Sequence, residues 1–494
     1  MKQDSHFQTF VKAGNPTGQV TAINSFVVSV SGLQPVSRQA LICFEDGSKG
    51  FVQHILEDSV TVLYLGVTPL KVGMGAVVQH NELVTKVGKD FIGRVISVTG
   101  EPLDGKGAIA ADGTWPIFGE APQLYERELL DTQLETGVTL IDTLFPIARG
   151  QRLALLGDSK SGKSTLATQI AINQRNTDQV VVYVMIAKRR SDIDMLIHRL
   201  TENNALDKAI VIVSTVFESL VLSWLAPYVG CAMAEYLWRA MNQDAIVLYD
   251  DLTTHAQIYR EISLLSGVSP GRDSYPGDIF HTHSQLLERA GKLKKNHRHL
   301  TAIPLVLIDG GDITGFIPTN IMSITDGQWI LDMDVFREGL RPAVSVGLSV
   351  TRVGGRGQND RQKAQHVAVQ KAVGDFLQAR EFAKFGSELA LTTQQAMERG
   401  HQLYDLFTQI PGETFNLMAQ QIMLDILLSS PAGAKLDINQ LKTLSVKSAA
   451  LVKTEKDYSG IVSTLRQQIG PIAPTAPQPA AAPAPAAPNP EAKP

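Results

Sequence analysis

The chain has 494 residues, of which 44% are hydrophobic and 19% are charged, and its formal net charge is -4. These values are typical of a globular protein with several domains, and they exclude a fibrous or wholly disordered chain. The slight negative charge provides no basic field that would attract nucleic acid. Two cysteines, Cys43 and Cys231, are too few for a disulfide scaffold or a cysteine-rich zinc module.

The first ten residues, MKQDSHFQTF, have neither the apolar centre of a signal peptide nor the Arg- and Ser-rich pattern of a transit peptide. Outside the C-terminal tail, the longest uncharged stretch covers residues 219–234 and is too short to span a bilayer. We therefore expect an intracellular protein that contacts a membrane only through partners.

Residues 1–77 are predicted to form a β-barrel domain. From Val20 to Val77, short runs rich in Val, Ile and aromatic residues are separated by Gly, Asp and Ser. Several such strands in so few residues are typical of a small barrel or sandwich.

Residues 78–358 are predicted to form an α/β domain. Apolar runs with the length of strands alternate there with helical stretches, which predicts a mainly parallel sheet covered by helices. These runs are LALL (153–156), VVVYVMI (180–186), AIVIVS (209–214), AIVLY (245–249) and IPLVLI (303–308).

Residues 359–470 have helical periodicity and are predicted to form an all-helical domain. Val369, Val373 and Phe376, for example, are spaced to share one helix face. Residues 471–494 are nearly all Pro and Ala, a composition that favours an extended tail over a packed core.

The strongest functional signal is GDSKSGKS at residues 157–164, which fits the phosphate-binding pattern G-x-x-x-x-G-K-[ST] between a strand and a helix. Its backbone N–H groups would wrap a phosphate, while Lys163 neutralises charge and Ser164 offers a hydroxyl directly to Mg²⁺. The predicted nucleotide-binding residues here are Gly157, Asp158, Ser159, Lys160, Ser161, Gly162, Lys163, Ser164 and Thr165.

A second signal is the apolar run 245–249, which ends in Asp250 and Asp251. In P-loop enzymes, a carboxylate at the end of a neighbouring strand holds a water of the magnesium ion. We therefore expect ATP or ADP with Mg²⁺ at this site, and Asp250 to contact the metal through water.

Several segments resemble the nucleotide-binding subunits of rotary ATP synthases, and above all the alpha subunits of F-type enzymes. They include FPIARGQRLALLGDSKSGKST, LAPYVGCAMAEY, FIPTNIMSITDGQ, RPAVSVGLSVTRVGG and residues 249–293. The likeness covers about residues 18–450. It implies an N-terminal β-barrel, a RecA-like core and a C-terminal helical bundle, in a hexamer that alternates with catalytic beta subunits around a rotating gamma shaft.

The resemblance also indicates which subunit type this is. Catalytic relatives carry Gly-Glu-Arg after the strand that follows the P-loop helix, whereas this chain has Ala187-Lys188-Arg189. A protonated lysine cannot act as the general base for water. We therefore expect this chain's own site to bind nucleotide without turning it over.

The segment Ser349-Val-Thr-Arg352 matches the alpha-subunit motif whose arginine reaches the γ-phosphate in the neighbouring catalytic site. The resemblance implies that Arg352 is this arginine finger and that Ser349 helps to place it. It also assigns Phe336, Arg341 and Pro342 to the pocket for the nucleotide base. The family's pair of glutamines near the adenine has no clear equivalent in residues 409–417.

Other polar groups are interpreted as structural. His281 and His283 lie near Asp278, but a third metal ligand is lacking, so packing is favoured over metal binding. The basic run 292–299 is interpreted as a solvated loop.

Taken together, the sequence predicts a noncatalytic alpha-type subunit on the cytoplasmic face of a bacterial plasma membrane. Its partners would be beta subunits, the gamma shaft and a delta or peripheral-stalk subunit, with no nucleic acid, and the complex would couple H⁺ or Na⁺ flow to ATP synthesis. Two alternatives remain open: a catalytic hexameric export ATPase, which Lys188 disfavours, and a RecA-like RNA helicase, which would need a more basic and aromatic N-terminal domain.

Overall fold

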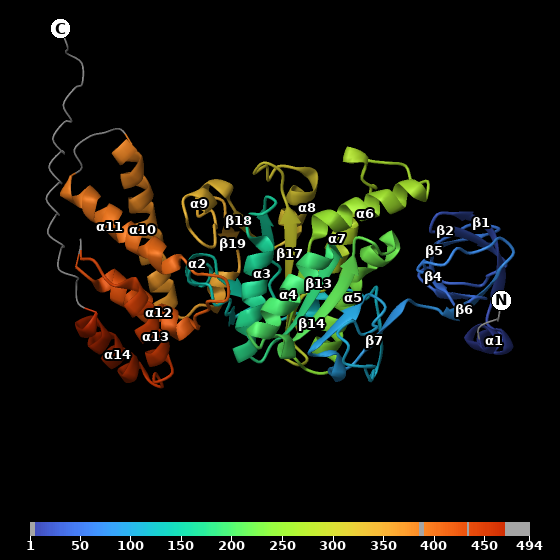
Figure 1. Ribbon diagram of the computed structural model, residues 1–494, viewed down its shortest axis with the longest axis horizontal. Helices are drawn as coiled ribbons and strands as arrows, with labels where there is room; N and C mark the ends of the chain where they lie inside the picture. Colours follow the sequence, from blue (N-terminus) through green and yellow to red (C-terminus); the bar gives the residue numbers. More distant parts are fainter. Residues whose placement is uncertain (1–4, 385–389, 432–433, 470–494) are drawn as a thin grey trace, which may run out of the picture.

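A computed structural model describes residues 5–384, 390–431 and 434–469. The chain is elongated, with a β-barrel at one end, an α/β body in the middle and a helical domain at the other end (Figure 1). The Pro/Ala-rich segment 471–494 lies outside the described residues.

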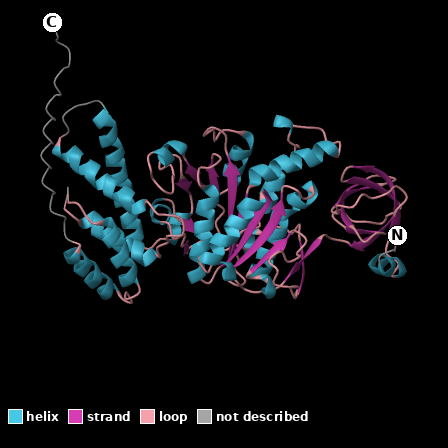
Figure 2. Ribbon diagram, in the orientation of Figure 1, coloured by secondary structure: helices cyan, strands magenta, loops and turns pink. Residues whose placement is uncertain are grey.

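The barrel is closed by six strands in the order β1-β2-β5-β4-β3-β6. Figure 2 shows this barrel at the N-terminal end of the chain. Alternate side chains such as Val28, Val30 and Val62 fill its interior, as the period-two pattern of strands requires. Helix α1 (Ser5–Lys12) packs on β6 through Phe7. The strands are β1 (Thr17–Asn24), β2 (Val27–Ser31), β3 (Leu41–Phe44), β4 (Lys49–Ile55), β5 (Val60–Tyr64) and β6 (Gly75–His80).

The central body contains a nine-stranded sheet with the strand order β19-β18-β12-β17-β15-β13-β14-β8, and β16 pairs with β17. All neighbouring strands are parallel except at β16 and β19, so the mainly parallel sheet is confirmed. The strands are β8 (Arg94–Ser97), β12 (Ala154–Gly157), β13 (Val180–Lys188), β14 (Ala209–Thr215), β15 (Ala245–Asp250), β16 (Gly291–Lys292), β17 (His299–Leu307), β18 (Gly327–Leu331) and β19 (Val350–Thr351).

Helices cover both faces of this sheet. Val181 and Tyr183 pack in one core cluster with residues of α3 and α4, while Val182 and Val184 pack in a second cluster with residues of α5. This alternation explains why the strand is continuously apolar, because both of its faces are buried. The helices are α2 (Thr139–Leu144), α3 (Lys163–Asn173), α4 (Arg190–Glu202), α5 (Leu220–Arg239), α6 (Leu252–Leu265), α7 (Ile279–Leu287), α8 (Phe316–Ile324) and α9 (Met333–Arg337).

Two small antiparallel pairs complete the central body: β7 (Val84–Val87) with β9 (Gly113–Pro116), and β10 (Gln133–Leu134) with β11 (Ile147–Ala148). Helix α5 is long and apolar enough to cross a membrane by composition alone, but 78% of its most apolar window is buried inside the fold. Its contacts with β13, β14 and β15 identify it as a core helix of the central body.

The C-terminal part is helical, as expected. Val369, Val373 and Phe376 are all buried along one face of the first helix, which confirms the periodicity noted in the sequence. Its apolar residues belong to the same cluster as one face of the central sheet, so the two parts share a continuous core. The helices are α10 (Asp360–Lys384), α11 (Leu391–Phe407), α12 (Leu417–Ser429), α13 (Ile438–Ala449) and α14 (Glu455–Gln468).

Candidate functional site

The phosphate-binding loop lies between the end of β12 and the start of α3, as its sequence pattern requires. A Cβ atom added to Gly157 would lie 2.5 Å from Ser161 Oγ, so the loop closes tightly only around a glycine. Gly162 precedes the helix with a φ of 103°, in the left-handed region that glycine adopts without strain. Ser159, Lys160 and Ser164 are exposed at the surface of the loop.

The Lys163 ammonium is held inside this loop. Its Nζ donates hydrogen bonds of 2.7 Å to the carbonyl oxygens of both Gly157 and Asp158. Burial lowers the pKa of Lys163 to about 8, and the carboxylates of Asp251 and Asp250 oppose that shift. The helix N-terminus and this ammonium together form a site suited to phosphate.

Lys188, the residue that replaces the catalytic glutamate, contacts both acidic residues at the end of β15. Its Nζ lies 2.6 Å from Asp250 Oδ1 and 2.9 Å from Asp251 Oδ2. Burial alone would lower the pKa of Lys188, but these two carboxylates raise it above its ordinary value. The side chain is therefore a fixed cation, and the sequence alone did not reveal which groups it would pair with.

The two aspartates have further partners. Asp250 Oδ2 accepts a hydrogen bond of 3.1 Å from the Tyr183 hydroxyl, and its Oδ1 is paired with Lys188. Asp251 Oδ1 accepts the Thr254 N–H at 2.7 Å and caps α6. Burial would raise the pKa of Asp251, but Lys188 and the Thr254 contacts lower it below its usual value.

The residues therefore fit Mg²⁺ only in part. The exposed hydroxyl of Ser164 is suited to the direct contact expected of it. The water-mediated role expected of Asp250 stays a prediction; one of its oxygens is paired with an ammonium and the other accepts from a phenol. A carboxylate with its negative charge already compensated is a poor acceptor for the water shell of a divalent ion.

A cavity of about 130 Å³ joins the loop helix to these groups and lies among α3, β13 and α4. Ser164 and Thr165 line it from α3, while Lys188 and Asp250 line it from the ends of β13 and β15. The fold thus brings together predicted residues from three separate segments of the chain. The cavity lining that sequence reasoning missed is Thr168, Tyr183, Met185, Asp192, Met195, Leu196 and Arg199.

Phe336, Arg341 and Pro342, the residues assigned to the nucleotide base, also lie together. The Arg341 guanidinium lies 3.4 Å from the centre of the Phe336 ring, and its Nη1 donates to the Phe336 carbonyl at 2.6 Å. The Gln409 N–H donates to the Arg341 carbonyl at 2.8 Å, which brings residues 409–417 to this place.

The sequence did not identify Gln409 as part of this region. Its side chain accepts the Thr139 N–H and donates to the Gly137 carbonyl, at 2.8 and 2.9 Å. These partners lie about 270 residues away in sequence, and no local pattern could have indicated them. The Gln409 side chain also donates to the Glu413 carbonyl at 2.8 Å, so its amide is bonded to backbone groups of three separate residues.

Arg352 and the phosphate-binding loop lie at opposite ends of the strands, Arg352 near the start of β18 and the loop near its end. The Arg352 N–H donates to the Asp326 carbonyl just before β18 begins, whereas Gly157 pairs with Leu331 at the end of that strand. The five residues of β18 separate these two ends of the sheet by about 16 Å. Arg352 is exposed, and its guanidinium makes one long hydrogen bond, of 3.4 Å, to the Thr325 carbonyl.

Ser349 occupies a different environment from Arg352. Its side chain is buried, and its hydroxyl accepts the Ile330 N–H at 3.0 Å. This bond attaches the segment before Arg352 to β18, alongside the short pairing of β18 with β19. Ser349 therefore positions the turn and does not point toward solvent.

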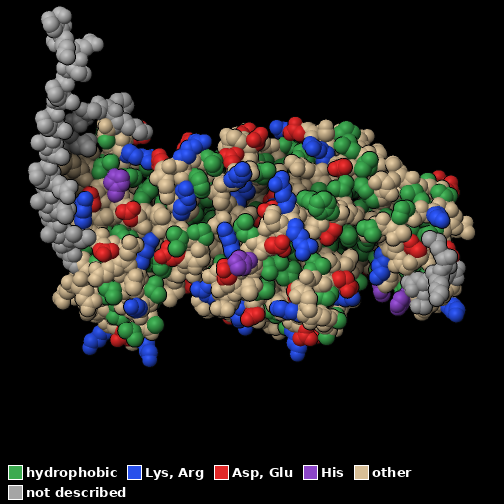
Figure 3. Space-filling view, in the orientation of Figure 1, with side chains coloured by type: hydrophobic (Ala, Val, Ile, Leu, Met, Phe, Trp, Pro, Cys, Tyr) green, Lys and Arg blue, Asp and Glu red, His purple; other side chains and the backbone are tan. Residues whose placement is uncertain are grey.

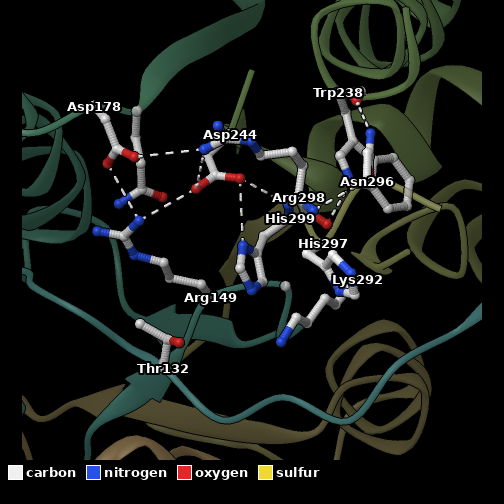
Figure 4. Close-up of polar contacts among 12 residues, drawn as sticks. Thr132, Arg149, Asp178, Trp238, Asp244, Lys292, Asn296, His297, Arg298 and His299 are labelled. Carbon is white, nitrogen blue, oxygen red and sulfur yellow. Dashed lines mark hydrogen bonds and ion pairs between the residues drawn. The ribbon is translucent and has the colours of Figure 1, made fainter. Parts of the chain in front are cut away.

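The interpretation of residues 292–299 as a solvated loop was wrong at both ends. Lys292 and His299 are each 6% exposed, although Lys294, Lys295 and His297 are exposed. The Lys292 ammonium donates to Asp131 at 2.9 Å. Figure 4 shows Asp244 between His299, whose N–H it accepts at 2.9 Å, and Arg149, at 3.2 Å. The two buried ends of the segment are paired with acidic residues from distant parts of the chain, which a local count of charges does not reveal.

Of the two histidines His281 and His283, His283 has the packing role expected of it. His281 is exposed, whereas His283 is buried and its ring nitrogen lies 3.1 Å from that of His255. In the part of the chain that the structure describes, no group of three or more His, Cys, Asp or Glu residues could hold a metal ion. On the face drawn in Figure 3, basic and acidic side chains are interspersed.

Comparisons with known proteins agree with this geometry. Residues 137–351 match the ATP synthase alpha/beta family, nucleotide-binding domain. The chain is 34% identical to the ATP synthase subunit alpha of Proteus mirabilis, over 92% of this chain and 91% of that protein. The subunit from Nitrosomonas europaea is 38% identical over 91% and 89%, and that from Sulfurovum sp. is 36% identical over 92% and 90%. The chain belongs to the family of ATP synthase alpha subunits.

Proposed function

We propose that this chain is the noncatalytic subunit of an F-type ATP synthase ring, in which it alternates with catalytic beta subunits. Family membership and the nucleotide-binding domain support a nucleotide-binding role within an ATP synthase. The finer assignment depends on two cationic residues. Lys188 lies at this chain's own site, and Arg352 lies at the opposite end of the strands.

The chain's own site would bind ATP or ADP without hydrolysing it. Lys163 and the N-terminus of α3 would hold the phosphates, the Ser164 hydroxyl would contact Mg²⁺, and Phe336, Arg341 and Pro342 would border the base. Hydrolysis needs a group that accepts a proton from water. The Lys188 ammonium, paired with Asp250 and Asp251, cannot do so.

Arg352 would act in the catalytic site of a neighbouring beta subunit. The length of β18, about 16 Å, separates Arg352 from this chain's own phosphate-binding loop. The arginine is therefore exposed at the other end of the strands. A planar guanidinium matches the oxygens of a transferring phosphoryl group and stabilises their charge in the transition state. This exposed arginine is the single observation that carries the proposal.

The complex would contain beta subunits, a gamma shaft and a delta or peripheral-stalk subunit, and would couple H⁺ or Na⁺ movement to ATP synthesis or hydrolysis. The chain itself would be a peripheral protein on the cytoplasmic face of the plasma membrane. Its only membrane-length apolar helix among the described residues, α5, is buried in the central body and would not anchor it.

Co-purification tests this proposal. The full chain is expressed with a tagged beta-type subunit that carries an intact Gly-Glu-Arg, and the assembly is sized and assayed for ATPase activity. We expect an alternating hexamer that hydrolyses ATP, while neither chain alone sustains turnover. A homo-oligomer of this chain that hydrolyses ATP by itself would contradict the proposal.

A further inference from the structure

Lys188 is paired with both carboxylates at the end of β15 and lines the cavity beside the proposed nucleotide site. The ammonium lies between the two carboxylates at the end of β15, at 2.6 Å from Asp250 and 2.9 Å from Asp251. Its side chain is 19% exposed, and those of Asp250 and Asp251 are 4% and 11% exposed. The three charges therefore interact largely out of water, where electrostatic attraction is weakly screened.

The formal charges of Lys163, Lys188, Asp250 and Asp251 balance one another at this end of the sheet, and Asp158 is the weakest of the charged groups that act on Lys163. Two ammonium groups, Lys163 and Lys188, face two carboxylates, Asp250 and Asp251, within one electrostatically coupled group. With an uncharged residue at position 188, the same group would carry one net negative charge beside the incoming phosphates. A divalent ion would then be needed to join the carboxylate to the phosphates.

We propose that the Lys188 ammonium takes over this role, so that the site binds a nucleoside di- or triphosphate with little dependence on Mg²⁺. The inference rests on the proposed nucleotide site at residues 157–165. Lys188 lines the same cavity as Ser164 and Thr165, so its charge lies beside the loop helix. Mg²⁺ bound through Ser164 would lack the second attachment that a free Asp250 would provide.

Nucleotide titration of the purified full chain tests this, with ATP added in excess MgCl₂ or in excess EDTA. For the wild-type chain we expect the two dissociation constants to differ by less than about threefold. In Lys188→Gln the carboxylates lose their cation, and removal of Mg²⁺ should weaken ATP binding by about tenfold or more. Lys188→Arg keeps the charge and should behave like the wild type.

Two further variants address folding and net charge. Lys188→Gln removes the cation that two buried carboxylates share and could destabilise the domain. The double variant Lys188→Gln/Asp251→Asn removes one of them, and asparagine still caps α6. This variant should also require Mg²⁺, because no ammonium then joins Asp250 to the phosphates, although the remaining charges of Lys163 and Asp250 balance. Lys295→Gln makes the same change of charge at an exposed position away from the cavity and should match the wild type.

The outcomes separate the two proposals. If ATP binds to none of these chains under either condition, the nucleotide site itself is wrong. If the wild type binds ATP, but loses affinity without Mg²⁺ as strongly as the folded Lys188→Gln variants do, the site stands and the role given to Lys188 is overturned. Equal insensitivity to Mg²⁺ in the wild type and in both Gln variants would also overturn it.

Discussion

Arg352 and Lys163 lie at opposite ends of the same pair of parallel strands. Lys163 follows the end of β12, while Arg352 is hydrogen-bonded just before the start of β18. One chain can therefore bind phosphate with one residue and present a guanidinium to a different subunit with the other. The predictions below test these two roles and the packing that supports them.

Replacing Arg352 should abolish catalysis without abolishing assembly. In the hexamer with beta subunits, Arg352→Ala should lower multisite ATP turnover by about 10³–10⁵, as for other arginine fingers. Arg352→Lys should restore little, because an ammonium lacks the planar fork. Steady-state ATPase assays beside nucleotide titration measure both effects. Arg356→Ala, at a nearby exposed position, is the matched control; equal loss in both variants would contradict a specific role.

The isolated chain should bind ATP through Lys163 and hydrolyse none of it. Loss of this charged donor in Lys163→Ala should weaken ATP binding about tenfold to a hundredfold. Lys295→Ala, which removes an exposed lysine elsewhere, should leave affinity unchanged. Calorimetric titration and a phosphate-release assay give the two readouts. Sustained turnover by the chain alone would show that it is a catalytic subunit.

Acidification should destabilise the central body through two buried histidines. Burial lowers the pKa of His255 to about 4, and burial lowers that of His283 well below its usual value. Because both folded-state pKa values lie below the unfolded value near 6.5, the unfolded chain binds more protons as pH falls through that range. Stability is complete above pH 6.5; from pH 7 to 5 His255 should remove about 2 kcal/mol, and His283 should add to that loss.

Urea unfolding at pH 7 and pH 5, followed by tryptophan fluorescence, measures this loss; Trp224 stacks on His255. His283→Gln should reduce the pH-dependent loss of stability, since one of two titrating groups is removed. His281→Gln changes an exposed histidine on the same helix and should leave the pH-dependent loss of stability unchanged. A similar reduction in both variants would mean that the buried pair is not its source.

Two helical glycines should respond to alanine in opposite directions. A Cβ atom at Gly230 of α5 would lie 2.2 Å from Val184 Cγ2, so Gly230→Ala should cost about 1–3 kcal/mol of unfolding free energy. At Gly374 of α10 no atom lies within 4 Å, so Gly374→Ala should gain about 0.5–1 kcal/mol from helix propensity. Denaturant midpoints measure both, and loss at Gly374 would contradict the packing described here.

The sequence predicts the fold best where local pattern and local physics coincide. The apolar run that ends at residue 156 and the glycines around Lys163 require a strand, a tight loop and a helix, and these form. The buried positions of Val369 and Val373 follow from periodicity in the same way.

The rest of the site depends on contacts between distant segments. Lys188 meets Asp251 across 63 residues, and Gln409 meets Thr139 across 270. The sequence alone shows that Lys188 stands in place of a catalytic glutamate. It does not show that Lys188 pairs with Asp250 and Asp251. The basic run 292–299 was misjudged for the same reason, because its acidic partners come from other strands and loops.

The position of β8 has a consequence for isolating the central body. This strand comes from residues 94–97, upstream of the matched segment 137–351, yet it forms the outer neighbour of β14. A fragment beginning at residue 137 would leave the backbone N–H and C=O groups along that side of β14 unpaired. Exposed strand edges recruit strands from other chains. Such a fragment should therefore aggregate, whereas one that begins before β8 keeps the edge covered.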